Sequence, residues 1–264
     1  KHPLTIRMEG IVPTVYPHEI IDWNEQHVGE VDKLPGIHSE EQFAAWLKVY
    51  NRNVDKWEAM NVADSVELAH YGVHNDGETP GTDGWTFYLW NDIDCKDMKP
   101  DANGAFVKAL TEGVTFDGKG YVLHNLMLDF EHTAPSSGRV GLIGEIRGGR
   151  LRNLHLDFVT VRNMDVDTPS GCIAGRISSG QIFDCTVREA KMMCRGGVAG
   201  VLAGEMSGGD MAGCKFHGMV QAKEMQDETE WGYKKIVNGV VGRMPSDFKG
   251  TVANDIINRV FITD

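Results

Sequence analysis

Hydrophobic residues follow two different periods along this chain. In HSEEQFAAWLKVY, residues 38–50, apolar side chains recur every three or four residues, which is typical of one face of an amphipathic helix. Ser39 stands three residues before Gln42, a pairing that favours a capped helix start. Beyond about residue 64 the period becomes two, as in WTFYLWNDID at residues 85–94, and this alternation predicts β-strands. The predicted apolar face of the helix consists of Phe43, Trp46, Leu47 and Tyr50.

The β-rich region repeats itself. LHNLML at residues 123–128 returns 28 positions later as LRNLHL, and looser copies, IFDCTV and MAGCKF, begin at residues 182 and 211. A single unit of this length is too short to bury its own apolar face, so each unit is expected to stack on the next as a coil of a solenoid. A last, less regular coil is expected from GVVGRM at 239–244 and INRVFI at 257–262.

Equivalent side chains of stacked coils lie about 4.8 Å apart and form columns. The alignment above predicts two inward, apolar columns and a row of polar corner residues that tolerate a left-handed backbone. The first column is predicted to hold Leu126, Leu154, Cys185 and Cys214, the second Leu128, Leu156, Val187 and Phe216, and the corners Asn125, Asn153 and Asp184.

The glycine-rich stretch GLIGEIRGG at residues 141–149 has two interpretations, a phosphate-binding loop or a bend in a repeating scaffold. A phosphate loop occurs once, between a strand and a helix. Here the glycine pattern returns around residues 175–180 and 204–209, and no helical pattern follows any copy. The glycines are therefore expected to shape the coils.

Two consecutive stretches, GVTFDGKGYVLHNLML at 113–128 and GLIGEIRGGRLRNLHL at 141–156, resemble the coils of GLUG-repeat proteins. FYLWNDIDC at 87–95 is similar to the segment that commonly precedes the first such coil. The resemblance covers roughly residues 85–216 and implies a right-handed parallel β-helix of the pectin-lyase-like kind. It also implies a surface-exposed or secreted protein of Bacteroides-like bacteria, often an adhesin or binding region, with no catalytic motif.

The predicted fold class is therefore mainly β, a right-handed parallel β-helix (solenoid) with an N-terminal capping helix. The right hand also follows from the general preference of parallel crossovers. We expect residues 1–64 to form an extended segment and the capping helix, and residues 65–264 to form the β-helix with its GLUG-like coils.

Charge and composition limit the classes of molecule that this chain is expected to bind. The chain has 38 acidic and 26 basic residues and a net charge of −12, which disfavours nucleic acid and anionic lipid. No run of 18 apolar residues predicts a transmembrane segment. The chain begins at Lys1 without an initiator Met, so any export signal is expected to lie outside it; the family resemblance implies an extracellular or cell-surface location.

Cysteine and histidine spacing gives little sign of a metal site. The five cysteines are odd in number and include no CxxC pair, so buried, reduced thiols are expected. His70 and His74 have the spacing of two helical metal ligands, but Gly72 lies between them and no Glu follows the first. No metal ion or cofactor is therefore predicted, with weak calcium binding by the loop at 74–84 as an open alternative.

One outward column carries candidate chemistry. Two stacked carboxylates beside a cation and a histidine would suit proton transfer in a polysaccharide lyase or hydrolase. Ordinary solvent-facing charges are the simpler interpretation. The candidates are Asp129, Asp157, Arg188 and His217.

Aromatic residues of the 85–94 strand are candidate ligand-binding residues, because aromatic faces on a solenoid flank can stack on sugar rings. Trp85, Tyr88 and Trp90 are the three candidates. The simpler alternative is that the inward members, such as Trp85, pack under the helix.

Taken together, these features predict a non-enzymatic exported or cell-surface β-solenoid, an adhesin-like or glycan- or protein-binding module. The alternative is a carbohydrate-active enzyme, a polysaccharide lyase or glycoside hydrolase, that acts on one face of the β-helix. The predicted partners are glycans or host or bacterial surface proteins, and not nucleic acid. The last coil has no obvious cover for its edge, so residues 256–262 are also expected to contact a further domain or an oligomer partner.

Overall fold

A computed structural model gives the structure of most of the chain after residue 33. Residues Pro35–Asp264 form one compact unit, which includes the predicted capping helix. The prediction for residues 1–33, and most of the predicted loop at 74–84, lie outside the described residues. The described residues are 34–75, 84–132, 134–136, 138–165, 168–194, 198–222, 233–234, 239–245, 247–252 and 257–263.

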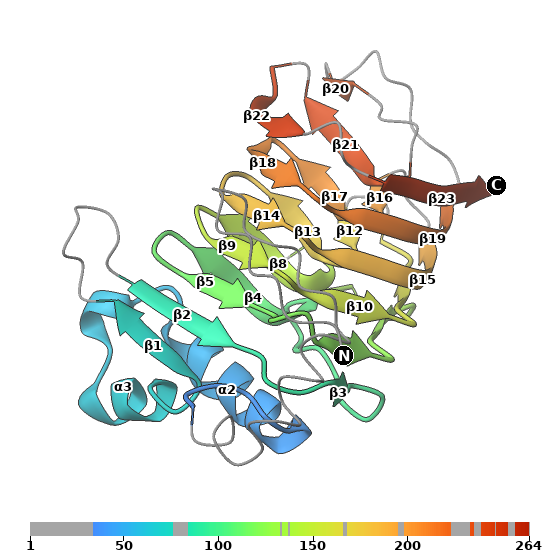
Figure 1. Ribbon diagram of the computed structural model, residues 1–264. Helices are drawn as coiled ribbons and strands as arrows, with labels where there is room; N and C mark the ends of the chain where they lie inside the picture. Colours follow the sequence, from blue (N-terminus) through green and yellow to red (C-terminus); the bar gives the residue numbers. More distant parts are fainter. Residues whose placement is uncertain are drawn as a thin grey trace, which may run out of the picture. The chain divides into compact units, whose positions relative to one another are not determined.

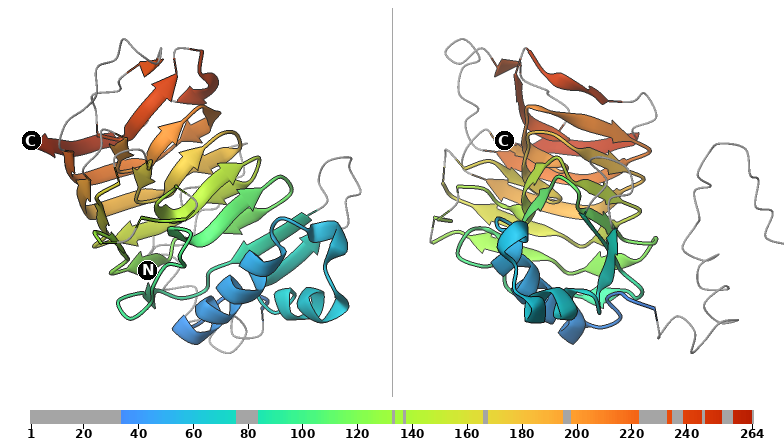
Figure 2. Two further views of the ribbon diagram at one scale, coloured as in Figure 1. Left: turned by 180° about the vertical axis from the view of Figure 1, so that it is seen from behind. Right: turned by 90° about the vertical axis from the view of Figure 1, so that its left-hand side faces the viewer.

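Short strands from successive stretches of the chain stack into three sheets, which makes this unit a β-solenoid (Figures 1 and 2). Neighbouring strands are parallel except in the pairs β1–β2 and β20–β21. The mainly β, parallel solenoid that the repeat predicts is thus confirmed. The seven-stranded sheet contains, in order, β1 (Gly72–Asn75), β2 (Gly84–Tyr88), β5 (Thr115–Asp117), β9 (Arg150–Arg152), β14 (Gln181–Phe183), β18 (Gly208–Ala212) and β22 (Lys249–Val252).

The other two sheets complete each coil. The eight-stranded sheet contains β23 (Ile257–Thr263), β19 (Lys215–Ala222), β15 (Thr186–Cys194), β10 (His155–Asp157), β6 (Val122–His124) and β3 (Ile93–Asp94). In the same sheet, β11 (Thr160–Asn163) pairs with the long strand β15, and β7 (Met127–Phe130) pairs with β11. The six-stranded sheet contains β20 (Tyr233–Lys234), β21 (Val241–Pro245), β17 (Ala203–Met206), β13 (Ala174–Ile177), β8 (Gly141–Arg147) and β4 (Ala105–Thr111). A short pair is formed by β12 (Ser170–Gly171) and β16 (Ala199–Gly200).

The last, irregular coil forms as the sequence predicts. β21 pairs with β17, β22 with β18 and β23 with β19, all in parallel. Within the described residues, β22 and β23 end their sheets. Contact of this edge with another domain or chain stays a prediction.

The predicted alignment of the first two coils is wrong by five residues. Leu123 lies opposite Leu156, 33 positions later, and not opposite Leu151. Leu128 correspondingly lies opposite Val161. The observed apolar column contains Ile93, Leu123, Leu156, Val187 and Phe216. The later part of the other predicted column is confirmed, because the registers of β10, β15 and β19 bring Leu154, Cys185 and Cys214 into line, but Leu126 is not part of it.

The misalignment has a physical cause, because left-handed corners occur at two different places in the coils. Asn153 and Asp184 lie at the first corner, with φ values of 52° for both. Asn125, with φ of 56°, lies instead at the second corner, where the next coils place Phe158 and Glu189. The left-handed backbone predicted for the three polar residues is confirmed. Because LxNLxL occurs at both kinds of corner, sequence similarity matched corners that are not equivalent.

Helix α2 (Glu40–Asn53) covers the end of the coil stack, as predicted (Figure 1). The Ser39 side chain accepts a hydrogen bond from the Gln42 amide at 3.3 Å, and Gln42 Oε1 accepts one from the His38 amide. Trp46 is fully buried, with ring centroids 5.4 Å from Phe87 and 5.1 Å from Phe116. The helix therefore closes the apolar interior of the first coils.

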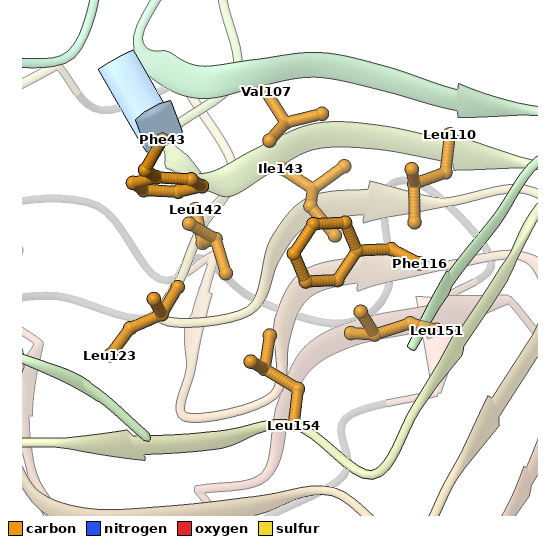
Figure 3. Close-up of a pocket in the computed structure, with 9 residues that line it drawn as sticks. All are labelled: Phe43, Val107, Leu110, Phe116, Leu123, Leu142, Ile143, Leu151 and Leu154. Carbon is orange, nitrogen blue, oxygen red and sulfur yellow. The ribbon is translucent and has the colours of Figure 1, made fainter. Parts of the chain in front are cut away.

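Side chains fill this interior almost completely. Figure 3 shows the ring of Phe43, from the helix, above Leu142 and Leu123, with Phe116 on another side of the same small cavity. The cavity that remains measures about 10 Å³, which leaves room for one water molecule at most. The part of the interior that these residues line is a packed core without room for a ligand.

Two short helical elements were not predicted, η2 (Trp57–Ala59) and α3 (Val62–Leu68). Val62 is 79% exposed and Val66 57%, so α3 lacks the apolar stripe that marks a buried helix in sequence. The sequence feature that indicates the start of α3 is Asn61, a favoured N-cap residue. Its side chain accepts a hydrogen bond from the Asp64 amide at 2.9 Å.

The repeated glycines lie where coils touch. A Cβ atom on Gly204 would come within 2.2 Å of the Ser170 amide nitrogen, and one on Gly175 within 2.9 Å of the backbone of the preceding coil. Gly180 and Gly209 adopt positive φ values of 103° and 96°. These contacts explain the glycine pattern as packing between coils, without a bound phosphate.

Charges on the six-stranded sheet alternate from coil to coil. Arg176 lies between Glu145 and Glu205, and Arg243 follows on the next strand. Arg176 Nε lies 3.3 Å from Glu205 Oε1, and Glu145 also pairs with Arg139 at 2.9 Å. The carboxylates and guanidinium groups of this face therefore form ion pairs, although Arg176 Nε makes no hydrogen bond among the described residues.

Candidate functional site

The predicted outward column of charged residues is only partly formed. Asp157 lies opposite Arg188 on the eight-stranded sheet, with 3.2 Å between Asp157 Oδ2 and Arg188 Nη2. Asp129 lies in a different column, opposite Arg162, whose Nη1 is 3.4 Å from Asp129 Oδ2. The predicted stack of Asp129 on Asp157 is therefore wrong, because it depended on the misaligned first coil.

His124 occupies the position predicted for Asp129. Its Nδ1 lies 4.0 Å from Asp157 Oδ2, and its Nε2 lies 3.9 Å from Asp92 Oδ2. Each carboxylate of the column thus faces an imidazole or a guanidinium group. The like-charge pair that the enzymatic interpretation requires does not form between Asp129 and Asp157.

His217 belongs to a bulge next to this column. The register of β15 and β19 shifts between Val187 and Ala190, so both Arg188 and Glu189 lie opposite His217. His217 Nδ1 lies 3.4 Å from Glu189 Oε1. Bulges redirect side chains and are frequent beside functional sites. Sequence reasoning identified His217 but missed Glu189, because nothing in the sequence marks the extra residue.

An open groove of about 480 Å³ lies beside the bulge. Its walls come from the end of β10 and from β11, β15 and β19, so three successive coils contribute. Its polar and apolar lining side chains are Phe158, Thr160, Glu189, Lys191, His217 and Met219.

Phe158 is the unusual residue of this groove. It lies at a left-handed corner with φ of 55°, a conformation that costs a bulky residue about 1–2 kcal/mol. Its side chain is nevertheless 57% exposed, so the ring gains little from burial. The equivalent corner of the preceding coil has Asn125, which tolerates this conformation. Strain combined with an exposed aromatic face points to binding.

The groove runs along the axis of the coil stack. Met127, Thr160, Lys191 and Met219 lie opposite one another on successive strands. These outward side chains repeat at the strand spacing of about 4.8 Å. A ligand in the groove would therefore meet one side chain of this column per coil.

The aromatic candidates lie elsewhere, on and beside β2. Trp85 is only 4% exposed, and its ring lies 4.9 Å from His74 and 5.6 Å from Phe87 by centroids. Burial makes Trp85 unsuitable as a ligand-binding residue, which corrects the prediction. Tyr88 and Trp90 are half-buried, with centroids 5.9 Å apart.

A lysine occupies the surface of this aromatic pair. Lys119 Nζ lies 4.8 Å from the Tyr88 centroid and 5.4 Å from that of Trp90. Such a cation–π contact stabilises the flank of the first coils. Lys119 also belongs to an insertion of two residues, because Asp117 and Val122 pair with residues that are closer together in the next coil. The pair is thus covered by the chain's own ammonium group.

The cysteines are all buried and free, as predicted. Burial and then the neighbouring Cys214 thiol raise the pKa of Cys185 well above its usual range. Burial likewise raises the pKa of Cys194 to about 11. These thiols are protonated at neutral pH and unsuited to nucleophilic chemistry.

His155 lies on the same sheet, one column from the charged residues. Its Nδ1 is buried without a hydrogen-bond partner in the described part of the chain. Burial, followed by the charges of Arg188 and Lys215, lowers the pKa of His155 to about 4, against a weak opposing effect of Asp92. The folded protein therefore holds His155 neutral.

This histidine predicts a loss of stability in acid. Between about pH 6.5 and pH 4 the unfolded chain binds a proton at residue 155 that the folded chain does not, so stability falls as pH falls through this window. We expect His155→Gln to flatten the dependence of the urea midpoint on pH between 7 and 4. His132→Gln, at an exposed position, is the control and should leave the slope unchanged. An unchanged slope in His155→Gln would contradict the prediction.

Metal ligands do not gather in the described parts of the chain, where no group of three or more His, Cys, Asp and Glu side chains could hold an ion. His70 follows α3 and His74 lies in β1, so they do not share a helix face. No helix among the described residues combines the length and apolar character needed to cross a membrane.

The groove combines an exposed aromatic ring with several hydrogen-bonding groups. Phe158 offers a flat apolar face, whereas Thr160, Glu189, Lys191 and His217 offer donors and acceptors around it. Sites of this kind bind ligands that have an apolar face and polar edges. No family model, no curated protein and no solved structure matches this chain, so its function is inferred from the groove itself.

Proposed function

We propose that this chain is a non-enzymatic β-solenoid that binds a glycan in the groove beside Phe158. The single observation that carries the proposal is the exposed Phe158 ring, held at a strained corner. The apolar face of a sugar ring can stack on an aromatic side chain, while Glu189 and His217 meet its hydroxyl groups.

The direction of the groove supports a linear ligand. Thr160, Lys191 and Met219 repeat along the stack, one per coil. A chain of sugar units could contact all three coils in turn, whereas a compact small molecule would use only one coil. A polysaccharide strand is therefore the ligand that uses the whole groove.

An exported or cell-surface, adhesin-like role is part of this proposal. It is supported by the resemblance of residues 113–128 and 141–156 to GLUG-repeat coils. The net charge of −12 suits a protein that must remain dispersed in solution or at a surface.

The non-enzymatic part of the proposal depends on the charged column. Asp129 and Asp157 each face an arginine and not one another. A polysaccharide panel assayed for reducing ends and for unsaturated products tests this point. We expect no turnover; turnover that is lost in Asp157→Asn would establish the carbohydrate-active enzyme instead.

Phe158→Asn separates binding from folding. Asparagine tolerates the left-handed corner better than phenylalanine does. The free energy of unfolding of the variant is therefore expected to be about 1 kcal/mol greater than that of wild type, so the variant is more stable. Loss of the ring is expected to weaken glycan binding at least about tenfold, which corresponds to about 1.4 kcal/mol. Chemical denaturation and equilibrium binding to an immobilised polysaccharide panel measure the two effects.

Tyr88→Asn is the matched control, because it removes an aromatic ring from the other flank. It should leave binding unchanged. If Phe158→Asn binds the panel as wild type does, the groove is not the glycan site. A variant that both loses stability and loses binding would instead assign Phe158 a structural role.

A further inference from the structure

We infer that the glycan bound in this groove is anionic and carries carboxylate or sulfate groups along its length. This inference rests on the proposed function and specifies the class of its ligand. It comes from the charges that β15 and β19 present on the outside of the sheet.

Basic groups outnumber acidic ones on these two strands. The basic side chains that point outward from β15 and β19 are Arg188, Lys191, Lys215 and His217, against the single acid Glu189 on these strands, and Lys191, His217 and Glu189 line the groove. This local excess stands on a chain whose net charge is −12. A basic region on an acidic protein concentrates a field that attracts anions.

Two of the ammonium groups have no ion-pair partner among the described residues. Lys191 and Lys215 are exposed and make no salt bridge there, whereas Arg188 pairs with Asp157. On the six-stranded sheet, by contrast, Arg176 and Arg243 both pair with Glu205, and Arg139, just before β8, pairs with Glu145. Lys191 and Lys215 thus lie, without an ion-pair partner among the described residues, on the face that also carries the exposed aromatic ring.

The position of Lys191 links this charge to the groove. Lys191 lines the groove and lies between Thr160 and Met219 in the axial column. The one acid of the lining, Glu189, lies 3.4 Å from the imidazole of His217. A sugar ring on Phe158 would therefore place an acidic substituent near the ammonium group of Lys191.

Matched polymers provide the test, because they share one backbone and differ in charge. The probes are dextran, carboxymethyl-dextran and dextran sulfate, measured by equilibrium binding to the wild-type chain. At about 50 mM salt we expect a charged polymer to bind at least about tenfold tighter than dextran, and about 500 mM salt should remove most of this advantage. The two charged probes distinguish carboxylate from sulfate.

Variants place the effect in the groove. Lys191→Gln and Lys215→Gln together should remove most of the preference for the charged polymer, and Lys249→Gln, an exposed lysine on β22, should not. Phe158→Asn should weaken binding of the charged polymer as well, because the ring and the ammonium group hold the same ligand.

The outcomes separate the two claims. If panel glycans bind through Phe158 but charge and Lys191 have no influence, the inference is wrong and the proposed function stands. If a charged polymer binds regardless of Phe158→Asn, its attraction is diffuse and the inference is wrong. If Phe158→Asn leaves all glycan binding intact, the proposed function itself is wrong. If neither charged polymer binds, the inference is overturned.

Discussion

Replacing Trp46 by alanine is expected to lower the free energy of unfolding by about 3–5 kcal/mol. The Trp46 side chain is fully buried and contacts Tyr50, Phe87 and Phe116. Its removal would leave a cavity between α2 and the first coils, at the only described place where a helix closes the interior of the stack. Urea denaturation followed by far-ultraviolet circular dichroism measures the loss.

Two further variants make this prediction specific. Trp46 Nε1 is buried and has no hydrogen-bond partner among the described residues, so Trp46→Phe should cost less than about 1.5 kcal/mol. Val62→Ala, at a position that is 79% exposed, should change stability by less than about 0.5 kcal/mol. Equal losses in Trp46→Ala and Val62→Ala would show that the helix does not close the core.

Replacing Gly204 by alanine is expected to lower the free energy of unfolding by about 3 kcal/mol. The added methyl group would lie 2.2 Å from the Ser170 amide nitrogen and 2.5 Å from the Pro169 carbonyl carbon. These are backbone atoms of the adjacent coil, and they cannot rotate away as a flexible side chain can. The same denaturation measurement checks the effect.

Gly138→Ala is the matched control for steric contact. Gly138 has a positive φ of 64° but nothing within 4 Å of the added Cβ. The substitution should therefore cost about 1 kcal/mol, the usual penalty for a left-handed conformation. A Gly204→Ala variant as stable as Gly138→Ala would refute close packing of coils as the reason for the repeated glycines.

The sequence was sufficient to predict the solenoid and its capping helix. Strands, close contacts between coils and helix starts each require particular residue types at nearby positions, and a single sequence is enough to show these patterns. Here the patterns are the period-two alternation, the repeated glycines and the Ser39–Gln42 cap. The hand of the coil stays a prediction. α3 escaped notice because its exposed valines lack amphipathic spacing.

The register of the first coils could not be obtained from similarity alone. Asn125 and Asn153 lie at different corners that need the same backbone conformation, so both corners select the same residues. The insertion around Lys119 then lengthens the first coil relative to the second. Matching LHNLML with LDFVTV at 156–161, a less similar pair, gives the observed pairing.

The groove was the least predictable feature for the same reason. Correct pairing of Asn125 with Phe158 would have shown an aromatic residue where asparagine is expected, and this was the available signal. Glu189 depends on a bulge in β15, which leaves no mark in the sequence. The sequence correctly predicted that three of the charged candidates, Asp157, Arg188 and His217, are neighbours. The fourth candidate, Asp129, lies in a different column.

Hydroxyl-radical footprinting tests glycan binding in the groove most directly, because phenylalanine, methionine and histidine side chains all react when exposed. The protein would be labelled alone and when saturated with the polysaccharide of the panel that binds most tightly. Met164, which is 37% exposed and does not line the groove, normalises the radical dose. Our account predicts protection of Phe158, Met219 and His217 with Tyr88 unchanged; saturated protein in which Phe158 reacts as fast as in the free protein would contradict it.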